Sequence, residues 1–358
     1  MAMIMVRPQK NTIAAIFVLL FSILAPQLIT STSILAQPLS DFTFIAYGDS
    51  RGAGDDAVSP IHSDIVTAYL QQNPDFVIHT GDMVNRGGIW NQWLEFNDSI
   101  QPIWDAGIPF FGVVGNHEKY TDQWNITDED FTQYGQFFNF ADFTNNPGET
   151  ELHYSFDYGG IHFIILNTED YFDYDTDIFN CSQTQMDWLL TDLANTRPTD
   201  FIIASYHRPA WSIRQNRVDR WDQAETIRQE FHQLFVQHGV DLVFCGHDHY
   251  YYRCIRDGIY YVVTGGGGAP PYPPDPTAPQ WQVGDVAYQA YHFCKIDVES
   301  TQVSVTAIQP DNTTIDFFVI NTMSQTIPIQ FQLLIVVTLC CVIVCIVLVI
   351  YFKKRKRF

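Results

Sequence analysis

Basic residues are scarce in this sequence. Its 358 residues include 19 Lys and Arg against 40 Asp and Glu, which gives a formal net charge of −21 at pH 7. Binding a nucleic acid polymer needs a basic footprint that displaces counterions, so this shortage argues against such a partner. Charged residues make up only 16% of the chain and hydrophobic residues 46%, which is enough apolar material for a packed core and excludes wholesale disorder.

Internal repeats are also absent, and no long linker precedes about residue 321. Short β-rich runs alternate with longer amphipathic runs, and from Ile259 onward only strand-like segments occur. The pattern predicts strands at 42–47, 76–80, 110–114, 152–157, 161–167, 201–206, 241–245, 260–264, 288–298, 303–308 and 314–320, and helices at 60–72, 89–104, 182–195 and 218–238. This order predicts an α/β fold in one domain with a strand-rich C-terminal half.

Acidic residues are missing from both ends of the chain. Arg7 and Lys10 precede an apolar run at 13–24, which is typical of a secretory signal peptide over residues 1–36. An uncleaved N-terminal anchor is the alternative, although the run is shorter than a membrane span.

The C-terminal end carries a second membrane signal. The stretch 326–352 is apolar enough to cross a bilayer, and the basic tail 353–358 follows it directly. Because such basic clusters stay in the cytoplasm, we expect one transmembrane helix and a cytoplasmic tail. The sequence therefore predicts a single-pass type I membrane protein whose middle segment, 37–325, lies in the extracellular space or a lumen.

Glycosylation signals and cysteines fit that compartment. Four Asn-x-Ser/Thr tripeptides lie in the middle segment, at Asn97, Asn125, Asn180 and Asn312. Four of the seven cysteines lie outside the predicted span, at Cys181, Cys245, Cys254 and Cys294. An even number is compatible with disulfides in an oxidising space, and strand-like surroundings favour the pair Cys254–Cys294. Buried free thiols are the alternative.

Polar clusters follow five of the predicted strands, which is where sites gather in α/β sheets. They are Gly48-Asp49, Gly81-Asp82, Gly115-Asn116-His117-Glu118, His207 and Gly246-His247-Asp248-His249. A single Gly-Asp is usually a turn and a single histidine is usually structural, so the prediction rests on the whole set. Two carboxylates, one carboxamide and several imidazoles suit a pair of divalent or mixed-valence metal ions such as Fe, Zn or Mn rather than a thiolate zinc site.

Over residues 41–320 the chain resembles the calcineurin-like metallophosphoesterases, whose motif series has the same five members in the same order. The segments 205–213 and 245–249 are most similar to the purple acid phosphatase branch. The resemblance implies a four-layer double β-sandwich flanked by helices. It also implies a metal-dependent phosphoric ester hydrolase, and an acid-phosphatase-like phosphomonoesterase is the main expectation.

The resemblance further implies two metal sites that share one carboxylate. Their ligands would be Asp82 as the bridge, Asp49 and His249 in the first site, and Asn116, His207 and His247 in the second. His117 would lie beside the substrate as general acid or oxyanion stabiliser. Two cations about 3.5–4 Å apart can hold a small phosphate ester and lower the pKa of the water that attacks phosphorus.

Two positions depart from the relatives. Arg51 stands where the family usually has a histidine, and Asn85 stands where the purple enzymes have a tyrosine. We therefore expect a weakly held first metal and no tyrosinate colour. The triplet 85–87 is similar to the Asp-Arg-Gly of phosphoprotein phosphatases, so Asn85 would orient His117 without a charge. Arg51 and Arg86 could bind phosphate oxygens or neutralise nearby carboxylates.

Other features leave alternatives open. Four arginines, Arg208, Arg214, Arg217 and Arg220, could attract an anionic substrate or pair with nearby acids. The glycine run 265–268 is weak evidence for a phosphate-binding loop. A phosphodiesterase acting on nucleotides or lipid headgroups is one rival function, and a non-catalytic binding ectodomain on the same scaffold is another.

Overall fold

The computed structural model describes residues 39–322, except for gaps at 54–55, 121–130, 139–151, 170–171, 174–177, 197–200 and 216–217. The chain divides into two units, Met1–Gln37 and Pro38–Phe358, and all described residues belong to the second. The predicted signal peptide (1–36), transmembrane helix (326–352) and basic tail (353–358) lie outside the described residues. Among the residues that are described, no helix is both long and apolar enough to span a membrane.

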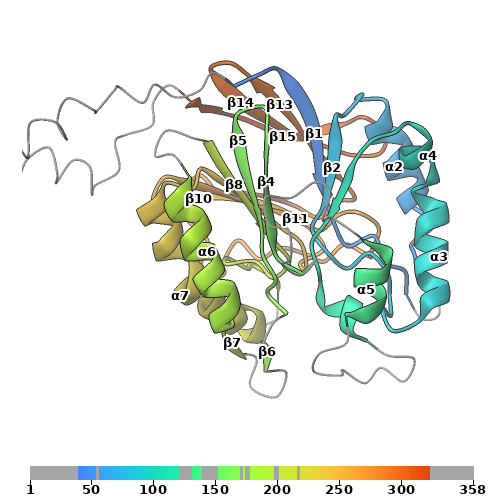
Figure 1. The fold of residues 1–358 in the computed structure, drawn as a ribbon, viewed down its shortest axis with the longest axis horizontal. Helices are drawn as coiled ribbons and strands as arrows, with labels where there is room; N and C mark the ends of the chain where they lie inside the picture. Colours follow the sequence, from blue (N-terminus) through green and yellow to red (C-terminus); the bar gives the residue numbers. More distant parts are fainter. Residues whose placement is uncertain are drawn as a thin grey trace, which may run out of the picture. The chain divides into compact units, whose positions relative to one another are not determined.

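Two β-sheets form the centre of this unit (Figure 1). The first sheet has the order β15-β14-β13-β1-β2-β3. Its strands are β1 (Phe42–Tyr47), β2 (Phe76–His79), β3 (Phe110–Gly112), β13 (Phe293–Glu299), β14 (Gln302–Ile308) and β15 (Thr314–Asn321). Strands β1, β2 and β3 are parallel to one another, and β13 pairs with β1 in the antiparallel sense.

The second sheet has the order β12-β10-β11-β9-β8-β5-β4. Its strands are β4 (Tyr154–Tyr158), β5 (Ile161–Ile165), β8 (Phe201–Tyr206), β9 (Leu242–Cys245), β10 (Tyr251–Arg256), β11 (Ile259–Thr264) and β12 (Val286–Tyr288). Strands β5, β8, β9 and β11 are parallel. A separate two-stranded sheet contains β6 (Phe172–Asp173) and β7 (Ile178–Phe179).

Helices cover the outer faces of the two sheets (Figure 1). Against the first sheet lie α2 (His62–Leu70), α3 (Trp90–Ser99) and α4 (Gln101–Asp105), and against the second lie α6 (Gln183–Asn195) and α7 (Val218–His238). The short elements α5 (Thr132–Phe137) and η1 (Asn116–Lys119) complete the set. The predicted double β-sandwich flanked by helices is confirmed.

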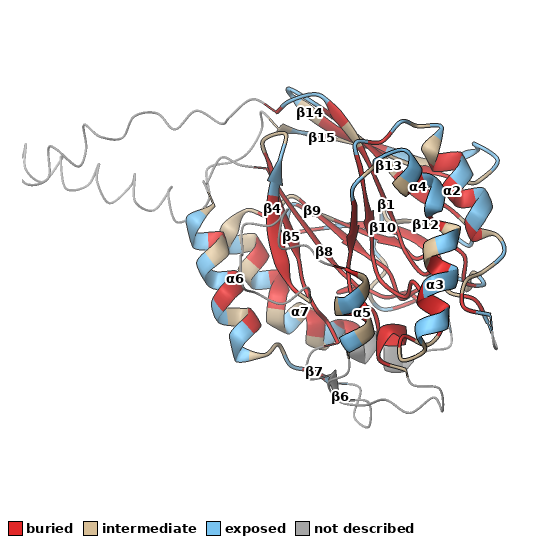
Figure 2. Cartoon of the chain, turned by 45° about the vertical axis from the view of Figure 1, so that its right-hand side comes forward, coloured by how far each residue is buried: buried red, intermediate tan, exposed pale blue. Residues whose placement is uncertain are grey.

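Aromatic side chains fill the space between the sheets. Phe44 and Phe76 of the first sheet stack with their ring centroids 5.0 Å apart, and each lies 5.4 Å from Phe163 of the second sheet in an edge-to-face arrangement. Such pairs add about 0.5–1.5 kcal/mol each beyond the burial of their surface. Figure 2 shows that the central strands of both sheets are buried along most of their length, as expected where both faces are covered, whereas the edge strands β12 and β15 are mostly not buried.

Two predicted elements are divided in the structure. The helix expected at 89–104 is two helices, because Pro102 lies in the first turn of α4 and has no N–H to continue the hydrogen-bond ladder of α3. The strand expected at 288–298 is also two, and its parts β12 and β13 belong to different sheets. The sequence predicted the helix and the strand correctly but did not predict that each is divided in two.

The favoured disulfide between Cys254 and Cys294 is wrong. Both residues are free thiols, and they lie in different sheets. Cys254 packs in the cluster between the second sheet and its helices, whereas Cys294 packs in the core that contains Phe44 and Phe163. The structure therefore supports the alternative of buried free thiols for this pair.

Two ion pairs of His162 connect helix α6 to the hairpin of β4 and β5. The Nδ1 atom of His162 lies 2.7 Å from Asp157 Oδ1, and its Nε2 atom lies 2.9 Å from Asp192 Oδ2 on α6. Ser155 also donates to Asp192, at 2.8 Å. Burial alone would lower the pKa of His162, but the two carboxylates outweigh it and raise the pKa to about 9.

We predict that these two ion pairs stabilise the folded chain at acidic and neutral pH and that the stabilisation is lost at alkaline pH. Because the folded-state pKa is above the unfolded value, the stabilisation is complete below pH 6.5 and is lost as the pH rises through about 9. His162→Gln should therefore reduce the free energy of unfolding by about 2 kcal/mol at pH 6 and by much less at pH 10. Urea unfolding of both proteins at the two pH values measures this, and an equal difference at both would contradict it.

Candidate metal centre

The polar clusters of the two sheets meet at one edge, beyond the carboxyl ends of their parallel strands. The turns after β1, β2 and β3 carry Asp49, Asp82 and Asn116, and those after β8 and β9 carry His207, His247 and His249. All six side chains are buried. The first sheet thus supplies oxygen ligands and the second supplies nitrogen ligands.

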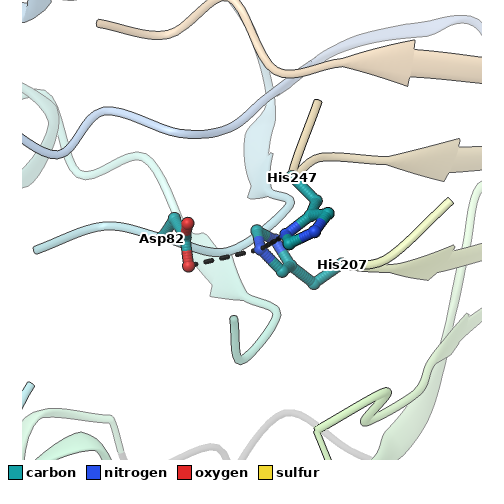
Figure 3. Close-up of side chains that lie close together, drawn as sticks. All are labelled: Asp82, His207 and His247. Carbon is teal, nitrogen blue, oxygen red and sulfur yellow. Dashed lines mark hydrogen bonds and ion pairs between the residues drawn. The ribbon is translucent and has the colours of Figure 1, made fainter. Parts of the chain in front are cut away.

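Asp82 belongs to two groups of potential ligands. One group contains Asp82, His207 and His247, and the other contains Asp49, Asp82 and His249; within each, the ligand atoms lie within 4.8 Å of one another. Figure 3 shows the first group, with Asp82 Oδ1 3.2 Å from His207 Nε2. A carboxylate common to two groups is what a bridging ligand requires.

Asn116 completes the second predicted site. Its Oδ1 atom lies 2.8 Å from His247 Nδ1 and 3.2 Å from His207 Nε2, and these two nitrogens are 3.2 Å apart. In a tetrahedral site with bonds of about 2.0–2.1 Å, neighbouring ligand atoms lie roughly 3.3 Å apart. The spacing of the three atoms therefore fits a shared cation.

The first predicted site has fewer ligand atoms. His249 Nε2 lies 3.4 Å from Asp49 Oδ1, and this oxygen is buried without a hydrogen-bond donor among the described residues. A buried carboxylate oxygen without a donor fits a cation, because burying it unpaired would be unfavourable.

Backbone carbonyls fix the orientation of two of the imidazoles. His207 Nδ1 donates to the carbonyl of Thr80 at 2.8 Å, and His249 Nδ1 donates to that of Pro270 at 3.1 Å. Each ring therefore carries a proton on Nδ1 and directs its Nε2 atom toward the carboxylates. Orientation by a second hydrogen bond is typical of metal-binding histidines.

Three of the predicted ligands have left-handed backbone conformations. Asp49, Asp82 and His247 have φ values of 61°, 57° and 70°. For non-glycine residues this costs about 1–3 kcal/mol each, and such strain gathers at functional sites. A Cβ atom at Gly115 would lie 2.4 Å from Asp82 Oδ1, so this turn needs glycine to let the carboxylate approach.

His79 connects the two aspartate turns and was not predicted. Its Nδ1 atom accepts a hydrogen bond from the N–H of Gly81 at 3.2 Å, so its Nε2 donates to Ser50 Oγ at 3.0 Å. Ser50 Oγ in turn donates to the carbonyl of Met83 at 3.0 Å. His79 is fully buried at the end of β2, and its place two residues before Gly81-Asp82 was the signal that the sequence offered.

Glu118 joins the Asp82 turn to the turn that contains Gly115. Its carboxylate accepts hydrogen bonds from the N–H groups of Asp82, Met83 and Gly115, at 2.9, 2.9 and 2.6 Å. The motif had included Glu118 without assigning it a role. The structure shows that it positions backbone and not a ligand atom.

The electrostatics of the centre favour cations. Burial alone would raise the pKa of Asp82, but His207, His117 and Arg51 hold it well below its usual range. Burial would lower the pKa of His207, and Asp82 outweighs burial and raises it to about 9. The buried carboxylates thus create a negative potential that stabilises positive charge at this point.

His117 lies against the shared carboxylate. Its N–H donates to Asp82 Oδ1 at 2.9 Å, and its Nε2 atom lies 3.9 Å from Asp82 Oδ2. Its Nδ1 donates at 2.7 Å to the backbone carbonyl of Asn85. The similarity to Asp-Arg-Gly had predicted that the Asn85 side chain orients His117, but in this hydrogen bond the backbone of Asn85 is the acceptor. Burial lowers the pKa of His117 to about 3.

The three predicted arginine contacts differ. Arg51 Nε lies 3.5 Å from Asp82 Oδ2, so its guanidinium borders the shared carboxylate. Arg86 is half-buried on the turn after Asn85, and its N–H donates to Gln92 Oε1 at 2.7 Å. Arg208 forms a buried bidentate ion pair with Glu169, at 2.6 and 3.0 Å. Glu169 was missed, although it follows a predicted strand as the other site residues do.

The glycine run 265–268 has a structural role. The N–H groups of Gly267 and Ala269 donate to the carbonyls of Gly48 and Asp49, both at 2.7 Å. A Cβ atom at Gly267 would lie 2.3 Å from the Gly48 carbonyl oxygen. The run therefore packs against the first aspartate turn and does not offer these N–H groups to a phosphate.

Comparison with known proteins agrees with this arrangement. The family described as calcineurin-like phosphoesterase matches residues 45–251. Purple acid phosphatase 15 of Arabidopsis thaliana is 32% identical over 189 residues, and purple acid phosphatase 23 of the same plant is 28% identical over 248 residues. These alignments cover 50% and 60% of this chain.

A solved structure shares the fold. The purple acid phosphatase from yellow lupin (Lupinus luteus) seeds superposes with a TM-score of 0.65 at 22% identity, over 80% of this chain and 54% of its own. The chain spans 32% and 51% of the lengths of the two Arabidopsis proteins, so it corresponds to only part of each. The matches confirm the resemblance to this family and to its purple acid phosphatase branch.

We predict that the two metal sites have unequal affinity. The guanidinium of Arg51 beside Asp82 opposes a second cation at the first site and supplies no ligand atom there. Isothermal titration of the full-length chain with Mn²⁺ should show one tight site and one that is about tenfold weaker or more. Arg51→His should tighten the weaker site, because a neutral imidazole replaces a cation.

Lys295→His is the matched control, because it makes the same kind of change on β13, where Lys295 pairs with Asp297 at 2.9 Å. It should leave both affinities unchanged. Two equal affinities in the wild-type chain would contradict the prediction that Arg51 weakens the first metal site.

Proposed function

Because the chain belongs to the calcineurin-like phosphoesterase family, we propose that it hydrolyses small phosphate esters, most readily phosphomonoesters, at the ligand groups around Asp82. The observation that carries the proposal is that Asp82 belongs to both groups. Further support comes from relatives named as purple acid phosphatases. Their names alone would not carry the activity over, since this chain covers only part of their length.

The proposal assigns each ligand a place. Asp82 would be shared by two metal ions (Fe, Zn or Mn), of which Asp49 and His249 would hold the first and Asn116, His207 and His247 the second. When bound, such a pair holds phosphate oxygens and lowers the pKa of the water that attacks phosphorus. The chain itself contributes the buried, oriented ligand atoms and excludes bulk water from them.

His117 is proposed to serve the leaving group. Its ring is held through Nδ1 by the carbonyl of Asn85, which directs Nε2 toward Asp82 and the space beside it. Because burial lowers the pKa of this imidazole to about 3, Nε2 would be protonated only when the negative charge of a bound phosphate ester stabilises the imidazolium. That proton could then go to the departing alkoxide or form a hydrogen bond to a phosphate oxygen. Arg51 and Arg86 are proposed to bind phosphate oxygens, as planar guanidinium groups do well.

The proposed location follows from the chain ends. The working segment 37–325 would lie outside the cytosol, anchored by the helix 326–352 and preceded by a removable signal peptide. Of the glycosylation signals, Asn180 and Asn312 are exposed, which supports their modification. Asn97 is half-buried, and its Oδ1 atom accepts a hydrogen bond from Trp104.

Asp82→Asn should reduce hydrolysis of para-nitrophenyl phosphate by at least about a hundredfold, because the amide loses the charge that both groups share. The assay uses the full-length chain with added Mn²⁺, Zn²⁺ or Fe. Asp297→Asn is the control, since Asp297 accepts from Thr43 at a part-buried position on β13. Faster turnover of bis(para-nitrophenyl) phosphate than of the monoester would favour the phosphodiesterase. No turnover with any metal would favour the non-catalytic ectodomain.

A second experiment tests His117. His117→Asn should slow hydrolysis of a phosphate ester with a poor leaving group, such as glycerol phosphate, by about a hundredfold or more. The loss for para-nitrophenyl phosphate should be much smaller, because nitrophenolate leaves without protonation. An equal loss of kcat for both substrates would exclude the proton-donor role and leave phosphate binding.

A further inference from the structure

Arg214 differs from the other arginines near the centre. Its guanidinium carbon lies 3.5 Å from the ring centroid of Tyr272. Most other described arginines pair with acids: Arg51 with Asp82, Arg208 with Glu169, Arg253 with Asp316 and Arg256 with Asp285. In a chain with a net charge of −21, Arg214 has no carboxylate partner among the described residues.

Tyr272 connects Arg214 to the candidate metal centre. Its ring stacks on the imidazole of His249, with centroids 4.1 Å apart and planes inclined by 17°. Since the His249 ring covers one face of Tyr272, the guanidinium lies on the other face. Arg214 is therefore one aromatic ring away from a predicted ligand.

Backbone hydrogen bonds hold this stack in place. Tyr272 N–H donates to the carbonyl of His249 at 2.7 Å, which sets the tyrosine beside the histidine turn. On the other side, Asp275 N–H donates to the carbonyl of Ile213 at 2.6 Å, and Gln215 N–H donates to that of Pro273 at 3.2 Å. The segments on both sides of the stack are thus joined, and the cation is positioned by the fold.

The guanidinium keeps its hydrogen-bonding capacity. Arg214 and Tyr272 are both half-buried, so the edge of the stack is accessible to solvent. No hydrogen bond from the side-chain N–H groups of Arg214 to a described residue is present. A guanidinium has five donors in a plane that matches a carboxylate or phosphate, and stacking on an aromatic face leaves those in-plane donors available.

We propose that Arg214, supported by Tyr272, binds a second anionic group of the substrate and so selects phosphate esters that carry a carboxylate or another phosphate. The inference rests on the proposed function, since it requires the phosphoryl group to be held at the ligands around Asp82. Arg214 acts in it as a specificity-determining residue. It takes no part in the chemical step.

The test compares ligands that differ only by the second charge. Phosphonoacetate and phosphonobutyrate are titrated by calorimetry into the full-length chain loaded with Mn²⁺, each against the uncharged-tail alkylphosphonate of equal length. For at least one chain length the wild type should bind the carboxylated ligand about tenfold more tightly. Arg214→Gln should lose this preference and bind the plain alkylphosphonate as the wild type does.

Three further variants test whether the preference for the carboxylated ligand depends on the planar donors of Arg214, on Tyr272 or on positive charge in general. Arg214→Lys should keep part of the preference, because it keeps the charge but not the planar donors. Tyr272→Leu should lose it, because the platform is gone. Lys295→Gln removes one positive charge from β13 and should change nothing.

The inference is overturned if the wild type binds no phosphonate or shows no preference, or if Arg214→Gln keeps the preference. It is also overturned if Arg214→Gln weakens the binding of both ligands equally, which would mean that the stack of Arg214 on Tyr272 only positions His249. Failure of the proposed function is separate: para-nitrophenyl phosphate would not be hydrolysed, yet the binding preference would persist.

Discussion

The site depends on how the two sheets pack against each other. Phe163 of the second sheet lies edge-on against Phe44 and Phe76 of the first, within the core that holds the two sheets together. Each sheet brings half of a coordination set, oxygen atoms from one and imidazoles from the other. Both ligand groups among the described residues combine side chains from the two sheets, so the centre exists only when the core between the sheets is formed.

Placing buried charges and strained turns at this edge needs support from the surrounding polar groups. The aspartate turns have left-handed residues at Asp49 and Asp82, and unpaired buried carboxylates would be strongly destabilising. His79 and Glu118 offset part of this by hydrogen bonds that tie the turns together. The glycine run 265–268 adds backbone hydrogen bonds from a third direction. The region is thus stabilised mainly by directed polar contacts, whereas the core behind it is apolar.

Cations bound at the centre would give it a charge opposite in sign to the net charge of the chain. The acidity of the chain would repel a phosphate ester at its bulk surface, but the proposed cations would invert the local field at the ligands. Arg51 beside Asp82 and Arg214 on Tyr272 add positive charge at two further points. An acidic protein can therefore accept a small anion at one place while the shortage of bases elsewhere still argues against a polyanion.

The sequence determined the type of fold, most of its elements and the identity of the six candidate ligands. These were readable because hydrophobic periodicity and strand-end motifs are local, and because the order of the motifs matches a known family. The sequence did not reveal the break between α3 and α4, the division of β12 from β13, or the separation of Cys254 from Cys294 into different sheets. It placed His79 and Glu169 near strand ends but did not show that His79 joins two turns, that Glu169 pairs with Arg208, or that Arg214 stacks on Tyr272. Only the tertiary structure decided these contacts, because each joins a side chain to a partner that is distant in the sequence and comes near it only after the chain has folded.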